Sequence, residues 1–271
     1  MNWGHLLHRA VHLLTETEGG KEATKKVGEV TTGALSDLTD GVIGTFNPKQ
    51  RMLNACKSGE LSKVKELVSN GVSVNFYFFN LSPVEVAIRN NRLSIVEYLT
   101  SKGANTKDLL VTAVKAPRPS YTIVKLVLDH GAYIDEKDSW TALMHALSGS
   151  CDSAICTLLI DKGASVNVSN CSSTPLECAI RGISSKRIGI DVCELLLKKG
   201  ANINGKNSYG GTALHTAAEL GSEEAIRFLL SYKADRSIRD NHGRTPLDKA
   251  REWCSNKPNC ETIASLLAPC L

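Results

Sequence analysis

Apolar residues recur at steps of three and four in six short segments of the chain, each followed by a glycine or, once, by a lysine. This spacing predicts an amphipathic helix in each segment, with one side turned toward a core. The residue that follows lies where helices often end in a left-handed conformation. The tripeptides that begin there are Gly71-Val72-Ser73, Gly103-Ala104-Asn105, Gly131-Ala132-Tyr133, Gly163-Ala164-Ser165, Gly200-Ala201-Asn202 and Lys233-Ala234-Asp235. They are 32, 28, 32, 37 and 33 residues apart, which indicates an internal repeat.

A second apolar segment precedes these helices and begins with Ser or Thr, usually followed by proline, as in Thr174-Pro175-Leu176 and Thr245-Pro246-Leu247. A hydroxyl cap followed by proline is a strong start signal for a helix. Each repeat is therefore predicted to contain a turn, an inner helix, a loop and an outer helix. The third repeat has Leu109-Leu110 in place of this start. The fifth and the last repeats carry extra residues, around 181–191 and 254–260, which we expect to bulge as longer loops.

Two sets of small or branched residues recur at equivalent positions of the repeats. We expect the first set to let the inner helices approach closely, and the second to fill the seams between outer helices. The first set is Ala87, Ala113, Ala146, Ala179 and Ala217, and the second is Leu99, Leu128, Leu159, Leu196 and Leu229.

The repeat resembles that of the ankyrin repeat family, whose period is about 33 residues and whose signature is Thr-Pro-Leu-His-x-Ala. The match is closest at Thr212-Ala213-Leu214-His215-Thr216-Ala217. The resemblance implies an all-α solenoid of helix-turn-helix units with short β-turn tips over residues 51–271, with about seven units counting degenerate ends. It also implies that His215 hydrogen-bonds backbone groups and stiffens the array, and that it is not a catalytic base.

Composition narrows the classes of function. Aromatic residues make up only 5% of the chain, so the core is expected to be aliphatic, and a net charge of +4 is too small to indicate nucleic-acid binding. The nine cysteines include no CxxC pair, and we expect them to be reduced and buried, with no metal or cofactor. No apolar run is long enough to span a membrane, and the start is not a convincing signal peptide, so a cytoplasmic or nucleocytoplasmic location is expected.

Residues 1–50 do not match the repeat. The stretch HLLHRAVHLL and a later pattern from Val27 to Phe46 each suggest a helix, and Pro48 is expected to end the second one. Three interpretations stay open: a helical cap on the first repeat, a docking helix for a groove in a partner, and an interfacial membrane helix.

The candidate partner-binding residues fall into two groups. Aromatic residues lie at the turn tips, and they either cap the end of the stack or contact a partner. They are Phe76, Tyr77, Phe78 and Phe79, with Tyr133, Trp140 and Tyr209 as weaker candidates. Basic residues follow the inner helices, and they form either a solvated rim or a groove that attracts an acidic peptide segment. They are Arg89, Arg92, Lys115, Arg118, Arg181, Lys186 and Arg187.

These observations favour a non-enzymatic interaction protein, an adaptor, scaffold or inhibitor, which binds a protein client on its concave face and turn tips. No phosphate loop, nucleophile elbow or metalloprotease helix is visible. An enzyme would need a cleft that gathers groups such as Asp191, Cys193 and His215, which repeat geometry does not predict. Two alternatives remain: a membrane-peripheral protein anchored by residues 1–50, and a microbial effector that acts on a host protein.

Overall fold

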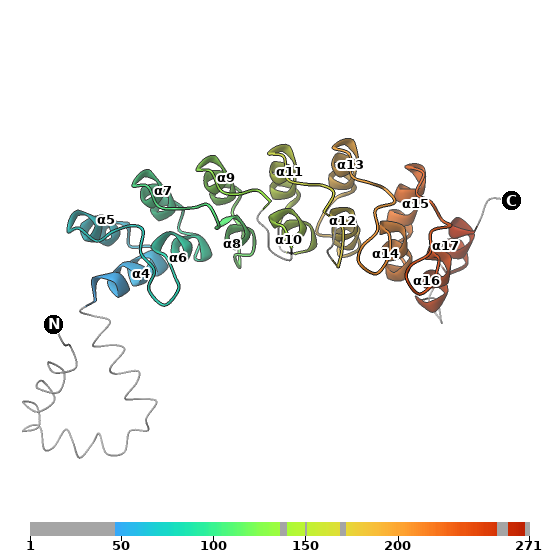
Figure 1. The fold of residues 1–271 in the computed structure, drawn as a ribbon, viewed down its shortest axis with the longest axis horizontal. Helices are drawn as coiled ribbons and strands as arrows, with labels where there is room; N and C mark the ends of the chain where they lie inside the picture. Colours follow the sequence, from blue (N-terminus) through green and yellow to red (C-terminus); the bar gives the residue numbers. More distant parts are fainter. Residues whose placement is uncertain (1–46, 136–139, 150, 169–171, 254–259, 269–271) are drawn as a thin grey trace, which may run out of the picture. The chain divides into compact units, whose positions relative to one another are not determined.

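The computed structural model describes residues 47–135, 140–149, 151–168, 172–253 and 260–268. Fourteen helices lie in this part of the chain and follow one another in pairs (Figure 1). The first helices of the pairs are α4 (Pro48–Ser58), α6 (Pro83–Arg89), α8 (Leu110–Val114), α10 (Ala142–Ser148), α12 (Pro175–Ser184), α14 (Ala213–Leu220) and α16 (Pro246–Trp253). The second helices are α5 (Leu61–Ser69), α7 (Leu93–Ser101), α9 (Tyr121–Asp129), α11 (Ser153–Asp161), α13 (Ile190–Lys198), α15 (Glu223–Ser231) and α17 (Cys260–Leu267).

The chain divides into two compact units, residues 1–54 and residues 55–271. The predicted boundary after residue 50 lies close to this division, and both positions fall inside α4. Pro48 begins this helix where the sequence suggested that it ends one, since the fixed φ of proline suits the first helical position. Residues 1–46 lie outside the described residues, so the three interpretations of that segment stay predictions.

Residues 55–271 form two layers of helices in a single row (Figure 1). In the inner layer α6, α8, α10, α12, α14 and α16 contact one another in that order, and in the outer layer α5, α7, α9, α11 and α13 do the same. One isolated antiparallel bridge, Phe78 to Leu81, is the only β pairing among the described residues. The predicted all-α solenoid is therefore confirmed.

The start signals act as predicted. Ser82 and Thr174 each cap an inner helix, and the glutamate three residues later, Glu85 or Glu177, accepts a hydrogen bond from the backbone N–H of the capping residue. Leu109 has no side-chain acceptor to offer, and α8 behind it is only five residues long. The inner helix of the third repeat therefore lacks the side-chain cap that the other start signals provide.

The outer helices end in the left-handed conformation that the repeat predicts. The terminal glycines, such as Gly71 and Gly163, have φ values of 85° and 92°. Lys233 replaces the glycine in the sixth repeat and still adopts a φ of 62°. A residue with a Cβ atom is strained in this conformation by about 1 kcal/mol or more.

The core contains nearly all of the residues expected there. All five inner-helix alanines are buried, and so are four of the five outer-helix leucines. Leu128 is the exception and is only half-buried, because Val127 lies four residues before its glycine and takes the buried position. The extra residues of the fifth repeat also differ from expectation, since the first of them lengthen α12 as far as Ser184 and only residues 185–189 form a loop.

A ladder of side chains joins consecutive turns between repeats. Asn75 accepts a hydrogen bond from Asn105 N at 2.9 Å and donates one to Gly103 O at 2.8 Å. Its counterparts Asp135, Asn167 and Asn204 accept from Ser165 N, Asn202 N and Asp235 N. At Lys107 the side chain cannot accept, and Tyr133 N donates to the Lys107 carbonyl oxygen. The side-chain link at this turn comes instead from the Thr106 hydroxyl, which donates to the His130 carbonyl oxygen at 3.2 Å.

Candidate protein-binding surface

We call each turn between an outer helix and the next inner helix a finger. The first finger, residues 75–82, presents its aromatic residues alternately to the core and to solvent. Phe76 is buried and Phe78 is half-buried, whereas Tyr77 is 70% exposed and Phe79 is 80% exposed. The prediction that Phe76 contacts a partner is therefore wrong, because its ring belongs to the core.

The tip of the first finger is a tight hairpin. Phe78 and Leu81 exchange two backbone hydrogen bonds, with N···O distances of 3.0 and 3.1 Å. Between them Phe79 and Asn80 have φ values of 49° and 59°. Two left-handed residues define the turn type that suits a hairpin, and it normally holds Asn, Asp or Gly. Asn80 fits this preference, but Phe79 adopts the conformation at a cost of about 1–2 kcal/mol.

The later fingers carry isolated aromatic residues. Tyr133 is 53% exposed and Tyr209 is 62% exposed, so both can reach a partner. Trp140 is half-buried, and its Nε1 donates a hydrogen bond to Ser172 Oγ at 3.3 Å. The Trp140 ring therefore links two neighbouring repeats, and only part of it faces solvent.

We call the seven predicted basic residues at or after the ends of the inner helices the basic edge, and three of them bind their own chain. Arg89 Nη2 lies 2.6 Å from Glu85 Oε1. Arg92 Nε donates to the Lys57 carbonyl oxygen at 3.0 Å, and Arg187 Nη1 donates to the Gly149 carbonyl oxygen at 2.7 Å.

The other exposed members of the basic edge are less engaged. The side chains of Lys115, Arg118 and Lys186 make no ion pair or hydrogen bond with any described residue. Lys186 also has a left-handed φ of 57°. Arg181 lies near the buried carboxyl group of Glu177, and its positive charge lowers the pKa of that group. The fingers and the basic edge lie at opposite ends of the inner helices, because α6, α8 and α12 each begin at a finger and end at a loop with basic residues. The structure thus presents two separate edges.

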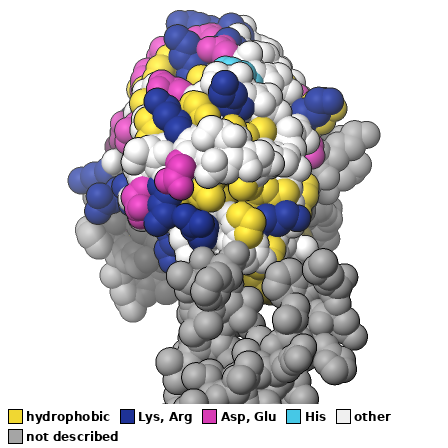
Figure 2. All heavy atoms as spheres, turned by 90° about the vertical axis from the view of Figure 1, so that its left-hand side faces the viewer, with side chains coloured by type: hydrophobic (Ala, Val, Ile, Leu, Met, Phe, Trp, Pro, Cys, Tyr) yellow, Lys and Arg dark blue, Asp and Glu magenta, His cyan; other side chains and the backbone are white. Residues whose placement is uncertain are grey.

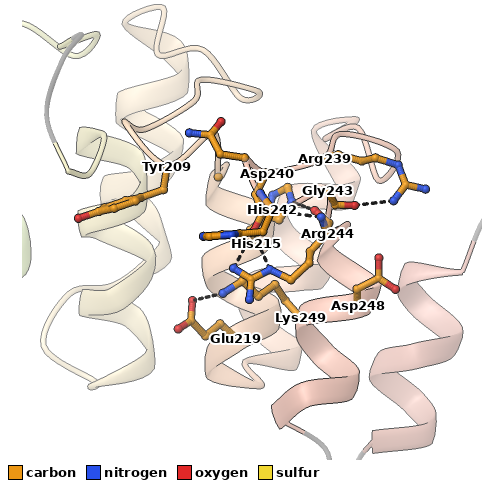
Figure 3. Close-up of polar contacts among 12 residues, drawn as sticks. Tyr209, His215, Glu219, Arg239, Asp240, His242, Gly243, Arg244, Asp248 and Lys249 are labelled. Atoms are coloured by element: carbon orange, nitrogen blue, oxygen red, sulfur yellow. Dashed lines mark hydrogen bonds and ion pairs between the residues drawn. The ribbon is translucent and has the colours of Figure 1, made fainter.

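His215 occupies the signature position and connects two repeats (Figure 3). Its Nδ1 accepts a hydrogen bond from Thr212 N at 3.2 Å, and its Nε2 lies 3.0 Å from the Arg244 carbonyl oxygen. A carbonyl only accepts, so Nε2 carries the proton. Burial lowers the pKa of His215, against the carbonyl contact that raises it. Both ring nitrogens are therefore occupied, and the structural role expected for His215 is confirmed.

Sequence reasoning missed a second junction of the same kind. Glu177 stands at the position of His215 in the preceding repeat and is fully buried. Its Oε2 accepts from Thr174 N at 2.6 Å, and its Oε1 accepts from Asn207 Nδ2 at 2.8 Å. Burial raises the pKa of Glu177 to about 7, although the hydrogen bonds and Arg181 oppose the rise. The sequence could have indicated this junction only through the two residues together, Glu177 at the signature position and Asn207 in the next finger. Neither residue alone predicts the hydrogen bond between them.

The turn that receives the His215 ring is closed by charged groups. Asp240 accepts hydrogen bonds from His242 N and Arg244 N, and its second oxygen accepts from Arg244 Nε at 3.0 Å. Arg239 Nη1 donates to the Gly243 carbonyl oxygen in the same finger (Figure 3). The charged side chains of this finger therefore stabilise its own backbone.

The described residues offer little for catalysis. A cavity of about 660 Å³ opens beside Lys233, Arg239 and Asp248, but Asp248 already binds the backbone and hydroxyl of Thr245. No group of three His, Cys, Asp or Glu side chains in this part of the chain could hold a metal ion. No helix there is long and apolar enough to cross a bilayer.

The cysteines mostly follow the expectation. Five of them are free and buried, and burial raises the pKa of Cys56, Cys151, Cys156 and Cys193 to about 12, so these thiols stay protonated. Cys260 departs from it, because it is disulfide-bonded.

Comparison with known proteins decides what the repeat is. A family model of ankyrin repeats in three copies matches residues 110–207 and 182–270, which together are more than half of the chain. The chain belongs to the ankyrin repeat family. Ankyrin arrays are protein-interaction modules, and the present array is one of them.

Two relatives share the repeats. The chain is 31% identical over 183 residues to the ankyrin repeat protein FPV031 of Fowlpox virus (strain NVSL), covering 63% of this chain and 43% of that protein. It is 29% identical over 240 residues to palmitoyltransferase AKR1 of Debaryomyces hansenii, covering 82% of this chain and 25% of that protein. The chain thus spans less than half the length of either relative, and the enzymatic name belongs to the longer protein.

Two solved ankyrin domains have the same fold. The ankyrin repeat domain of Bcl-3, a member of the IkappaB protein family, superposes with a TM-score of 0.65 at 26% identity, over 80% of this chain and 97% of that one. The ankyrin repeat domain of human ASB11 gives a TM-score of 0.67 at 22% identity, over 81% of this chain and 98% of that one.

Proposed function

We propose that this ankyrin array is a non-enzymatic adaptor, scaffold or inhibitor that binds one client protein across its inner helices and their two edges. Its described helices form an open row, and most of the polar side chains between them make hydrogen bonds that stabilise the turns. An open row offers an extended surface to a partner and little shelter from water for chemistry.

The basic edge indicates what kind of client the array binds. Arg89 is neutralised by Glu85, but Lys115, Arg118 and Lys186 keep their charge without a partner among the described residues. Cations in the last turn of a helix stabilise its carbonyl end, which accounts for Arg89 and Arg181. Lys115, Arg118 and Lys186 lie beyond the helices, so this effect does not require them. They suit an acidic segment of the client, which they would attract before contact.

A defined acidic peptide tests this proposal. We expect a fluorescein-labelled peptide of alternating Glu and Ala to bind the full chain, as measured by fluorescence anisotropy. The substitutions Arg118→Glu and Lys186→Glu should each weaken binding severalfold and reduce its dependence on salt, because both place repulsive charge on the edge. Arg89 is a poorer choice, since its reversal would face Glu85.

Lys198→Glu supplies the matched control. Lys198 is exposed on the outer helix α13, and its side chain has no ion pair or hydrogen bond with a described residue. Its reversal changes the net charge of the protein equally but lies away from the basic edge. If all three variants bind alike, or if the peptide does not bind, the proposal for the acidic client is wrong. The membrane-anchored alternative depends on residues 1–50 and stays a prediction.

A further inference from the structure

The first finger carries no charged side chain, a feature that it shares with the finger at residues 165–174. Residues 67–84 contain no Lys, Arg, Asp, Glu or His, whereas the finger at Lys206 and the one at Arg239 carry cations. Yet this uncharged finger holds the two most exposed large hydrophobic side chains of the described chain, Phe79 and Tyr77. Exposed apolar side chains in a segment that has no charge of its own indicate a contact site.

The conformation of Phe79 has no local explanation. The hairpin would accept Asn, Asp or Gly at this position with less strain, and the adjoining Asn80 shows that choice. The core does not require the ring either, since it is 80% exposed. Backbone strain that neither the turn nor the core requires is concentrated at functional sites, because selection keeps it there.

The Phe79 ring is held firmly even though it is exposed. The paired backbone groups of Phe78 and Leu81 fix the tip, and the rings of Phe78 and Phe79 stack edge to face with centroids 4.5 Å apart. Phe78 is half-buried and so connects the exposed ring to the repeat below. A rigid aromatic ring loses little entropy when a partner encloses it.

We infer that Phe79, with Tyr77 beside it, inserts into an uncharged apolar pocket on the client protein. This inference rests on the proposed function, because it requires that the array binds a protein client. The lack of charge in residues 67–84 disfavours an anionic membrane, which attracts basic residues. A second copy of the chain is also disfavoured, because the cavity beside Lys233 and Asp248 is lined by charged residues as well as by leucines.

The surface around the finger allows such an approach. Figure 2 looks at the array from the α5 end and shows hydrophobic side chains open on the surface, with Lys and Arg side chains around them. In Figure 1 the loop between α5 and α6 extends beyond α6, and the Tyr77 and Phe79 side chains of this loop are exposed.

The decisive variant is Phe79→Asn, because the two roles of the ring predict opposite changes. Asn accepts the left-handed conformation, so the melting temperature should rise by about 2–4 °C. The client loses an aromatic contact, so the affinity should fall at least tenfold. Phe79→Tyr keeps the ring and should bind like the wild type. Tyr121→Asn removes a ring that is 46% exposed on the outer helix α9, and it should leave affinity unchanged.

The client is obtained by cross-linking from the full chain. A photoreactive phenylalanine at position 79, and another at position 121 as the control, are irradiated in a lysate of cells that naturally express the protein. A protein captured only from position 79 is identified and purified, and its affinity for each variant is measured by calorimetry. Tighter folding combined with weaker binding of Phe79→Asn supports the inference.

Several results would overturn the inference. They are a lower melting temperature of Phe79→Asn, unchanged affinity for the purified protein, no capture specific to position 79, Phe79-dependent dimers in sedimentation, and Phe79-dependent binding to vesicles of phosphatidylcholine with phosphatidylserine. The acidic-peptide assay is independent of Phe79. If that assay succeeds while Phe79→Asn binds the client normally, the inference fails and the proposed function stands.

Discussion

The junction between Glu177 and Asn207 gives a sharp test of how the repeats are joined. The substitution Asn207→Asp keeps the shape of the side chain and its acceptor oxygen, which receives Tyr209 N and Gly211 N. It replaces the donor that lies 2.8 Å from Glu177 Oε1 with a second carboxylate oxygen. Two carboxylates then face each other, one of them fully buried.

The cost of this substitution depends on pH. Two like charges about 4 Å apart repel by about 4 kcal/mol at the effective dielectric constant of protein surfaces. The carboxyl of Glu177, whose pKa is about 7, escapes this by keeping its proton and donating it to the new carboxylate. At pH 6 it is already protonated, so the free energy of unfolding should fall by less than about 1 kcal/mol. At pH 9 holding that proton costs about 2–3 kcal/mol, which should appear as lost stability.

The neighbouring junction supplies a rescue. There His215 takes the place of Glu177, Asp240 takes the place of Asn207, and the imidazole reaches the Arg244 carbonyl oxygen. Adding Glu177→His to Asn207→Asp copies this arrangement, and it should recover most of the stability lost at pH 9. Urea unfolding followed by circular dichroism at pH 6 and pH 9 measures all three proteins. Equal losses at the two pH values, or no recovery in the double variant, would refute the reasoning.

Three further predictions concern packing and backbone strain, and urea unfolding checks the first two. Gly182→Ala should destabilise the fold by about 1–3 kcal/mol, because the new Cβ would lie 2.6 Å from Ile188 Cδ1 and 2.9 Å from the Leu147 carbonyl oxygen. This clash should outweigh the better helix propensity of alanine. Unchanged stability would contradict this prediction. Lys233→Gly should stabilise by about 1 kcal/mol, since its φ is 62°, and a loss would show that the lysine side chain stabilises the fold. In hydrogen exchange the amides of Leu110–Val114 should exchange before those of the other inner helices, because that helix is only five residues long and has no side-chain cap. Slower exchange than in α12 would contradict this.

The fold could be predicted because each repeat carries its own signals. A hydroxyl cap with proline marks the start of an inner helix, and a glycine marks the end of an outer one. Because these signals recur in several repeats, a misleading signal in one repeat does not change the predicted fold. Errors arose where a signal was absent or ambiguous. Leu128 and Val127 are both apolar, and only the distance to the following glycine assigns the buried position to Val127. Pro48 is compatible with either end of a helix, and the structure shows that it begins one.

The candidate surface was harder to predict, because exposure and pairing are properties of the folded chain. The run from Phe76 to Phe79 could be recognised as aromatic, but the sequence could not show that Phe76 faces the core and Phe79 faces solvent. The left-handed φ of Phe79 was also invisible, since the preference of the turn argues against phenylalanine there. Basic residues were equally recognisable, but Arg89 proved to be neutralised by a glutamate one helical turn away.

The repeats that lack the signature histidine show why its loss does not break the array. Where the next finger offers a carbonyl acceptor, as at Arg244, a histidine reaches it. Where the next finger offers an amide donor, as at Asn207, a glutamate reaches it and still closes the capping box of its own helix. Glu85 binds Arg89 instead, and its capping box remains. In two of these repeats the residue at the capping position therefore matches the group that the next finger presents, and we expect a mismatch there to cost stability. These junctions lie between neighbouring repeats and do not involve the exposed Phe79 or Arg118, so the stacking does not depend on the residues that we propose for the client.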